Sequence, residues 1–242
     1  MKGVILAGGA GTRLRPATCV LNKHLLPIGP YPLILFVIGQ LKRAGITDLL
    51  LVTGKDDLGD FAAFLGSGEA YGVSLTYRVQ ERPAGIADAL RLAQPFTGRE
   101  KFVAVLGDNL FEDDLTPWIQ AFAQEGPGAR VLLKAVPDPR PYGVAEVRDG
   151  RIVSLEEKPA CPKSAFCVTG IYLFDEQVYA IIADLAPSPR GEFEITDVNR
   201  QYLARGQLRY GILSGWWIDA GTPEALWEAN RRFAERALSL HL

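Results

Sequence analysis

The sequence predicts an α/β fold with a mixed, mostly parallel sheet, helices on both faces and a small antiparallel lobe. In the first half of the chain, short apolar runs alternate with segments of helical periodicity, which is typical of βα units. In the second half, strand-like runs follow one another closely, which favours antiparallel pairs at one edge of the sheet. The first half is therefore expected to be Rossmann-like.

The elements of the first half are separated by glycine and proline. The first strand is the apolar run at residues 4–6, which leads into a glycine-rich loop. Gly45 and Gly66 close two helices, while Pro83 and Gly85 precede a third. We expect further strands at 48–53, 74–79, 102–106 and 131–136, and helices at 33–44, 56–65, 86–93 and 118–124.

The second half begins after residues 138–141, a proline-containing loop that we expect at the change of lobe. Strands are expected at 144–147, 152–155, 168–174 and 208–213, and helices at 178–185, 195–204 and 223–238. Pro223 suits the first turn of the last helix, because that position needs no backbone N–H. No repeat or linker interrupts the chain, so one domain is expected over residues 1–242.

Composition narrows the class of protein. The chain has 242 residues, 48% of them apolar, which is enough for a sizeable core without disulfides. Its net charge of −2 argues against a nucleic-acid binder, and its three cysteines lack the spacing of a zinc site or disulfide framework. Met1 leads straight into a strand, and no apolar run reaches the ~20 residues that span a bilayer. A cytoplasmic protein with neither signal peptide nor membrane contact is expected.

The loop after the first strand is a candidate phosphate-binding loop. Gly8, Gly9 and Gly11 let the backbone turn sharply and approach a ligand, and successive N–H groups in such a loop can hold an anion. Arg13 adds a fork of donors suited to phosphate. Leu14 stands where the dinucleotide-binding fingerprint needs glycine, and no Gly-Lys-Ser/Thr ending follows, so the loop matches neither common phosphate motif. An ordinary tight turn is the alternative interpretation.

Two acidic residues follow apolar runs elsewhere in the chain. Asp108 comes soon after the strand expected at 102–106, and Asp219 directly follows Trp216-Trp217-Ile218. Ligands of open parallel sheets bind beyond the carboxyl ends of the strands, so Asp108 and the glycine loop are expected at one edge. Two carboxylates facing a phosphate loop predict a Mg²⁺ site. Taken singly, Asp108 is better explained as a turn residue and Asp219 as the neighbour of a helix start.

A series of short motifs occurs along nearly the whole chain. They are Gly8-Gly9-Ala10-Gly11-Thr12-Arg13-Leu14, Lys23-His24-Leu25-Leu26-Pro27, Gln80 with Pro83 and Gly85, Gly107-Asp108-Asn109, Tyr142-Gly143-Val144, Glu156-Glu157-Lys158-Pro159, Val168-Thr169-Gly170, Arg190-Gly191-Glu192, Glu194-Ile195-Thr196-Asp197 and Trp217-Ile218-Asp219-Ala220-Gly221-Thr222. In this order they resemble the motifs of the sugar nucleotidyltransferases, and within that family the thymidylyltransferases.

The resemblance implies a role for each motif. Residues 1–136 would be mainly a nucleotide-binding half and residues 137–242 mainly a sugar-phosphate-binding half. The catalytic residues would be Arg13, Lys23 and Asp108, and Asp108 with Asp219 would bind Mg²⁺. The nucleotide would be held by Leu6, Gly8, Gly9, Gly11, Thr12, Gln80, Pro83, Gly85 and Asp108. The sugar phosphate would be held by Asn109, Tyr142, Gly143, Glu157, Lys158, Val168, Arg190 and Trp217.

The reaction that the resemblance implies is transfer of a nucleotidyl group from dTTP to glucose 1-phosphate, which yields dTDP-glucose and pyrophosphate. The attacking phosphate oxygen is already an anion, so no catalytic Ser, Cys or His is needed. UTP or CTP in place of dTTP is one alternative, since Gln80 can pair with thymine or uracil. A non-catalytic nucleotide-sugar sensor is another, although a sensor need not retain both metal carboxylates. The oligomeric state stays open, with a homo-oligomer as one expected outcome.

Three features depart from the family pattern. His24 stands where the thymidylyltransferases usually carry Gln, and Tyr31 precedes Pro32 where the family commonly has Lys. The missing charge at residue 31 is expected to alter phosphate handling or specificity. The sequence ends at Leu242, without the C-terminal helical extension that carries a second nucleotide site in longer relatives. Product inhibition through such a site is therefore not expected.

Overall fold

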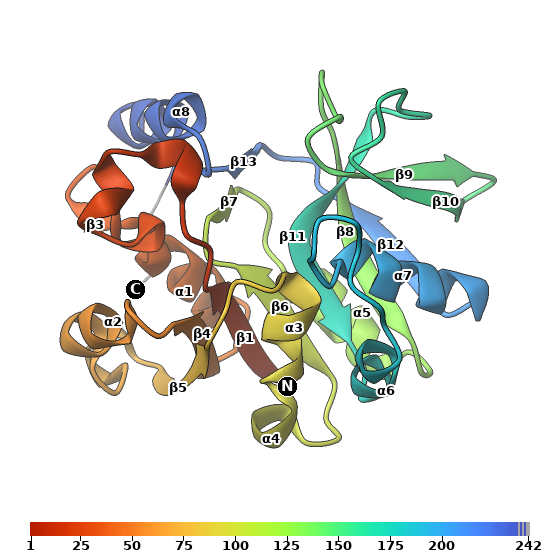
Figure 1. The fold of residues 1–242 in the computed structure, drawn as a ribbon, viewed down its shortest axis with the longest axis horizontal. Coiled ribbons are helices and arrows are strands. Elements are labelled where there is room, and N and C mark those ends of the chain that lie inside the picture. Colours follow the sequence, from red (N-terminus) through yellow and green to blue (C-terminus); the bar gives the residue numbers. More distant parts are fainter. Residues whose placement is uncertain (237, 239, 241–242) are drawn as a thin grey trace.

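The computed structural model describes residues 1–236, 238 and 240, and a nine-stranded sheet is its largest element (Figure 1). The strands of this sheet are β1 (Lys2–Ala7), β4 (Asp48–Gly54), β5 (Ser74–Gln80), β6 (Phe102–Leu106), β8 (Ala129–Ala135), β9 (Gly143–Arg148), β10 (Arg151–Glu157), β11 (Phe166–Phe174) and β12 (Leu208–Ile212). Seven of them follow the order β10-β9-β11-β6-β1-β4-β5, and β8 joins β11 to β12.

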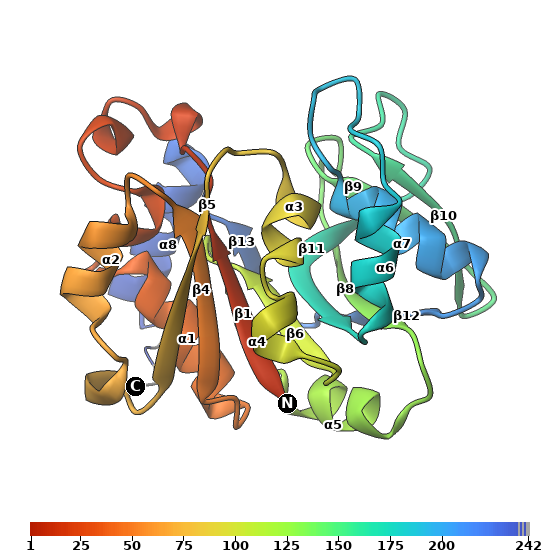
Figure 2. The ribbon, with the colours of Figure 1, turned by 60° about the horizontal axis from the view of Figure 1, so that its bottom comes forward.

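The side of the sheet formed by the first half of the chain is parallel. β5, β4, β1 and β6 run in the same direction, and in β1 the pairing sets Ile5 beside Leu51 and Val105. Residues 3–7 of β1 are all buried, as the apolar run predicts for a strand covered on both faces. The carboxyl ends of these strands therefore meet at one edge, which is the upper edge in Figure 2. The predicted mixed, mostly parallel α/β class is confirmed.

Helices cover both faces of the sheet, as expected. They are α1 (Leu33–Arg43), α2 (Leu58–Leu65), α3 (Ile86–Arg91), α4 (Gln94–Thr97), α5 (Thr116–Gln124), α6 (Gln177–Ala183), α7 (Ile195–Ala204) and α8 (Pro223–Ala234). One apolar core lies between the sheet and α1, α2 and α5, and a second lies between the sheet and α3, α6 and α7. None of the helices in the described residues is long and apolar enough to cross a membrane.

Three expected helices have different limits. The helix expected at 86–93 is α3, which ends at Arg91, and a separate short helix, α4, follows outside the expected range. Pro95 lies in the first turn of α4, where a proline starts a helix rather than continuing one. The helix expected from residue 56 begins at Leu58. The last helix ends at Ala234 instead of about Leu238, and Arg236 has a left-handed φ of 57° that is incompatible with another turn. The remaining expected elements match to within two or three residues at each end.

Short strands and 3₁₀ turns complete the description. The short strands are β2 (Pro27–Ile28), β3 (Tyr31–Pro32), β7 (Asn109–Phe111) and β13 (Trp217–Asp219), and the 3₁₀ turns are Thr12–Leu14, Ala17–Cys19, Lys23–Leu25 and Glu69–Tyr71. The antiparallel hairpin of β9 and β10 joins the sheet through β11 and lies at the end opposite β4 and β5 in both ribbon views (Figures 1 and 2). β13 pairs with β7, which places residues more than 100 positions apart in the sequence side by side.

Candidate active site

A cleft of about 710 Å³ opens at the edge of the sheet where β1 and β6 end. Nearly all the residues that the sequence predicts for a site line it, from both halves of the chain. They are Leu6, Gly8, Gly9, Thr12, Arg13, Lys23, Gln80, Pro83, Gly85, Asp108, Asn109, Tyr142, Gly143, Glu157, Lys158, Val168, Arg190, Trp217 and Asp219. Gly11 is the exception, since it is not among the lining residues.

The glycine loop packs closely against the side chains of Gln80 and Lys23. A Cβ on Gly8 would lie 2.8 Å from Oε1 of Gln80, and one on Gly9 would lie 3.3 Å from Nζ of Lys23. Gly11 has a φ of 59° and precedes the 3₁₀ turn at Thr12–Leu14. It therefore contributes to the loop through its backbone conformation and not as a lining residue. Side chains at Gly8 and Gly9 would displace two of the functional groups that the sequence predicts for this loop.

The two predicted metal carboxylates meet because β7 and β13 pair. The register places Asp219 opposite Asn109, and the backbone N–H of Ala220 donates to the carbonyl of Asp108 at 2.9 Å. The Lys23 ammonium pairs with Oδ2 of Asp108, and Nδ2 of Asn109 donates to its Oδ1 at 3.2 Å. Both oxygens of the Asp108 carboxylate therefore have partners within the site.

The electrostatics of the two carboxylates differ. Burial tends to raise the pKa of Asp108, but the Lys23 ammonium and the hydrogen bonds from Lys23 and Asn109 hold it well below its usual range. Burial, together with the negative charge of Asp108, raises the pKa of Asp219 to about 6. The negative charge of the Asp219 carboxylate is thus only partly neutralised by other groups of the protein. A cation bound by its oxygen atoms would stabilise this charge.

Asn109 ties together the three elements behind the acidic residues. Its Oδ1 accepts hydrogen bonds from the N–H of Gly170 in β11 at 2.9 Å and from Nε1 of Trp217 in β13 at 2.7 Å. A Cβ on Gly170 would lie 2.7 Å from the Asn109 amide, so only glycine fits there. Trp217 in turn packs edge-on against Tyr142, with ring centroids 5.2 Å apart. Asn109, Tyr142 and Trp217 consequently form one connected wall.

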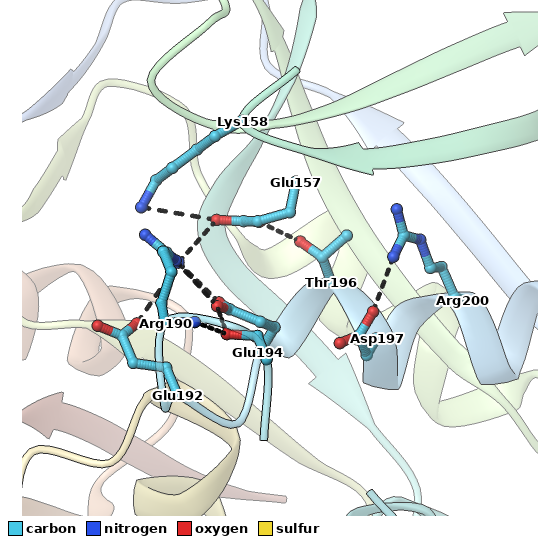
Figure 3. Close-up of polar contacts among 9 residues, drawn as sticks. Glu157, Lys158, Arg190, Glu192, Glu194, Thr196, Asp197 and Arg200 are labelled. Atoms are coloured by element: carbon cyan, nitrogen blue, oxygen red, sulfur yellow. Dashed lines mark hydrogen bonds and ion pairs between the residues drawn. The ribbon is translucent and has the colours of Figure 1, made fainter. Parts of the chain in front are cut away.

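The opposite part of the cleft holds a cluster of charged residues (Figure 3). Arg190 makes a forked contact with Glu194, at 2.8 and 3.0 Å from Nη2 to the two carboxylate oxygens. Nη2 also lies 3.5 Å from Oε1 of Glu157, and Nζ of Lys158 lies 3.6 Å from the same oxygen. The hydroxyl of Thr196 donates to the other oxygen of Glu157 at 2.5 Å. Two cations are thereby held at the mouth of the cleft by carboxylates.

Lys158 has an unusual backbone conformation. Its φ is 43°, in the left-handed region that non-glycine residues seldom adopt, and its N–H donates to the carbonyl of Tyr142 at 3.0 Å. This hydrogen bond joins the end of β10 to the loop before β9. The turn directs Lys158 into the cluster of Figure 3, next to Glu157 and Arg190.

The segment at 80–87 connects the two halves of the chain. The N–H of Phe193 donates to the carbonyl of Ala84 at 2.8 Å, and the N–H of Ala87 donates to the carbonyl of Phe193 at 3.1 Å. Gly85 has a φ of 102°, and a Cβ there would lie 2.6 Å from the Phe193 carbonyl oxygen. A close approach of two backbones therefore requires glycine at this position.

The two departures from the family pattern have different positions. His24 lines the cleft and is buried, and its Nδ1 lies 2.6 Å from Oδ1 of Asn22, which can only accept. Burial and the neighbouring Lys23 lower the pKa of His24 to about 3, so the ring is neutral near pH 7. Tyr31 does not line the cleft but packs edge-on against Phe36 and Phe233. The residue at position 31 thus belongs to the packing of α1 and α8.

Further lining residues were not among the predicted site residues. They are Ala10, His24, Ile86, Ala89, Leu106, Pro141, Gly170, Tyr172, Glu192, Glu194, Ile195 and Thr196. A signal for two of them, Gly170 and Tyr172, is the two-residue period of β11, because these residues and Val168 all line the cleft. Glu192, Glu194 and Thr196 lie in two motifs of the resemblance, but the sequence did not show that these side chains line a cleft.

Gly221 provides a test of the geometry around Asp219. A Cβ there would lie 2.6 Å from Nη2 of Arg13 and 2.9 Å from Oδ1 of Asp219, and the φ of Gly221 is outside the left-handed region. We expect Gly221→Ala to fold normally but to shift both groups and lower kcat/KM about tenfold to a hundredfold. The matched control is Gly59→Ala in α2, where a Cβ meets nothing within 4 Å. Steady-state kinetics and thermal unfolding measure both; unchanged kinetics in Gly221→Ala would contradict this placement.

Comparison with known proteins identifies the family. The model of the nucleotidyl transferase family matches residues 2–236. A glucose-1-phosphate thymidylyltransferase of Neisseria meningitidis is 43% identical over 233 residues, which cover 95% of this chain and 81% of that protein. One of an Actinoplanes species is 41% identical over 226 residues, covering 92% and 74%. A crystal structure from Bacillus anthracis, described as a candidate glucose-1-phosphate thymidylyltransferase in complex with a sucrose, has a TM-score of 0.92 at 52% identity and covers 96% and 94%. The chain belongs to the nucleotidyl transferase family of enzymes.

Proposed function

We propose that this enzyme transfers a nucleotidyl group from dTTP to glucose 1-phosphate, giving dTDP-glucose and pyrophosphate. The observation that carries the proposal is the convergence, in one cleft, of a glycine loop with two cations, a pair of carboxylates and a second cationic cluster. Two anionic substrates that must meet need charge compensation at both ends of such a cleft. The names of the thymidylyltransferases at 41–43% identity support the choice of substrates.

The nucleotide-binding half comprises residues 1–136. Arg13 and Lys23 neutralise the triphosphate beside the backbone of Gly8, Gly9 and Gly11, and Thr12 lies on the same loop. The base lies between Leu6 of β1 and the segment that contains Gln80, Pro83 and Gly85. The side chain of Gln80 and the backbone of Gly85 pair with the pyrimidine.

The sugar-phosphate-binding half comprises residues 137–242. Glu157 with Tyr142 and Gly143 holds the hexose, and Val168, Trp217 and Asn109 form the surrounding wall. Lys158 and Arg190 hold the phosphate. Since Glu194 engages Arg190 from the buried side, the guanidinium keeps a fixed position from which its remaining N–H groups can reach a phosphate oxygen.

Enzymes of this family generally use a divalent metal ion, and we propose Mg²⁺ held by Asp108 and Asp219. The donor set fits this ion, because Mg²⁺ prefers oxygen ligands and is commonly held by one or two carboxylates plus substrate phosphates. When bound, Mg²⁺ supplies charge stabilisation to the reacting phosphates. Among the described residues no group of three or more His, Cys, Asp or Glu side chains forms a metal site of another kind.

The chemistry that this chain's own residues perform is positioning and charge neutralisation. An oxygen of the sugar phosphate attacks the α-phosphorus in line, a new P–O bond forms, and the bond to the leaving pyrophosphate breaks. The nucleophile is already ionised, so no general base is needed to take a proton. Arg13, Lys23 and Lys158 offset the repulsion between the two anionic substrates. The cytoplasm is the proposed location of this enzyme.

The experiment that tests this function is pyrophosphate release with Mg²⁺ for dTTP, UTP, CTP, GTP and ATP, each combined with glucose 1-phosphate and other sugar 1-phosphates. Highest kcat/KM for dTTP with glucose 1-phosphate is the expected result. A clear preference for another pair would keep the reaction class and replace the substrate assignment. Nucleotide binding without turnover for every pair would overturn the enzymatic proposal in favour of a nucleotide-sugar sensor.

A further inference from the structure

The side chain of Gln80 is held in one orientation by groups that can only accept hydrogen bonds. Gln80 ends β5, is buried and lines the cleft. Its Nε2 donates to Oδ2 of Asp88 at 2.8 Å and to the carbonyl of Gly85 at 3.2 Å. A carboxylate and a carbonyl have no proton to give, so both partners require the NH₂ group of the amide and reject its oxygen. The two hydrogens of Nε2 are thus committed to the protein.

The amide oxygen of Gln80 is consequently the atom left for a ligand. Oε1 faces the glycine loop, 2.8 Å from the position of a Cβ on Gly8, and it accepts no hydrogen bond from any described residue. The adjacent backbone N–H of Gly85 likewise has no acceptor in the described part of the chain. A free acceptor and a free donor therefore lie next to each other at this wall of the cleft.

This pair of groups has a definite complement among the pyrimidine bases. Thymine and uracil present an N3–H donor beside a carbonyl acceptor, which matches the Gln80 oxygen and the Gly85 N–H. Cytosine presents a lone pair at N3 beside an amino group, the reverse pattern, so two acceptors and two donors would face each other. An unpaired or mismatched polar group in a buried site carries the full cost of its desolvation.

We propose that Asp88 is a positioning residue that determines base specificity: by fixing the Gln80 amide, it makes the cleft select bases with an N–H beside a carbonyl and reject cytosine. This inference rests on the proposed function, because it concerns the base of that nucleotide substrate. Asp88 lies in the first turn of α3, and its other oxygen accepts from Nη2 of Arg91 at 2.9 Å. An acidic residue in a first helical turn also stabilises the helix on its own, and that purely structural role is the competing explanation.

The discriminating variant is Asp88→Asn. Arg91 can only donate, so it draws the oxygen of the new amide and turns its NH₂ toward Gln80, which favours the flipped Gln80 orientation. We expect the ratio of kcat/KM for dTTP to that for CTP to fall about tenfold or more. Dissociation constants of dTMP and CMP, measured by calorimetry, should likewise become more nearly equal in this variant. Asp88→Glu restores an acceptor-only group and should keep most of the selectivity, and Arg91→Gln, which removes only the exposed partner, should leave it nearly unchanged.

The outcomes separate the inference from the function on which it rests. Equal losses for both nucleotides, or an unchanged ratio, would show that Asp88 supports only the helix and would overturn the inference while the enzymatic function stands. Absence of turnover with every nucleotide in the unmodified enzyme would instead overturn the function, and the comparison of dTMP with CMP binding would still test the pairing. Binding of dTMP no tighter than that of CMP to the unmodified protein would overturn the inference directly.

Discussion

Replacing Asp108 by Asn is expected to lower kcat by on the order of a thousandfold while the protein remains folded. Asn has nearly the same shape and keeps a partner for Asn109, but it removes the charge with which Asp108 would hold a metal ion beside Asp219. The loss should appear as a fall in the rate of pyrophosphate release at saturating substrates. Circular dichroism and thermal unfolding verify the fold, and Mn²⁺ binding followed by electron paramagnetic resonance should weaken in parallel.

Asp56→Asn is the matched control for this experiment. Asp56 is also an aspartate that follows a parallel strand, since it lies just beyond the end of β4, but it is exposed and does not line the cleft. Its substitution should leave kcat and metal binding unchanged. Near-normal turnover in Asp108→Asn, with the same metal affinity as the unmodified protein, would contradict the assignment of Asp108 as a metal ligand.

The order of strands and helices could be predicted from the sequence because apolar runs and glycine positions indicated the same boundaries. Apolar runs bounded by glycine predicted β1, β4 and β6 closely, and Gly45 and Gly66 follow α1 and α2 with a left-handed φ. The errors occurred at the ends of helices. The short helix α4, with Pro95 in its first turn, was not expected, and the periodicity after Pro223 continued for a turn beyond Ala234. Short strands such as β7 depend on a distant partner, so no local pattern marks them.

The site was predictable as a set of motifs but not as a set of contacts. The rule that ligands bind beyond the carboxyl ends of parallel strands placed the glycine loop and Asp108 at one edge, and both line the cleft. What the sequence could not predict is which groups pair. The contact of Lys23 with Asp108 spans 85 positions and that of Asn109 with Trp217 spans 108. Such pairings follow from strand register and loop conformation, which local composition does not determine.

Replacing Lys23 by Met should reduce both activity and stability, the second largest effect that we expect. Met keeps the length and apolar stem of the side chain but removes the ammonium that pairs with Asp108 and neutralises the triphosphate. Loss of one cation at the reacting phosphates should lower kcat/KM about a hundredfold to a thousandfold. The buried Asp108 carboxylate, whose side chain is 7% exposed, would lose its cation, so the free energy of unfolding measured without metal should fall by roughly 1–3 kcal/mol. Lys55→Met, at an exposed lysine beyond β4, is the control and should change neither quantity.

The double variant Lys23→Met with Asp108→Asn separates the loss of stability in Lys23→Met from its loss of activity. If the instability of Lys23→Met comes from an uncompensated carboxylate, neutralising Asp108 should return the free energy of unfolding to near that of the unmodified protein. Activity should stay low, because the double variant lacks both a phosphate-binding cation and a metal carboxylate. A double variant no more stable than Lys23→Met would show that Lys23 stabilises the loop by packing against Gly9 and Gly11 instead of by its charge. The pairing would then be a consequence of how the loop folds and not a cause of it.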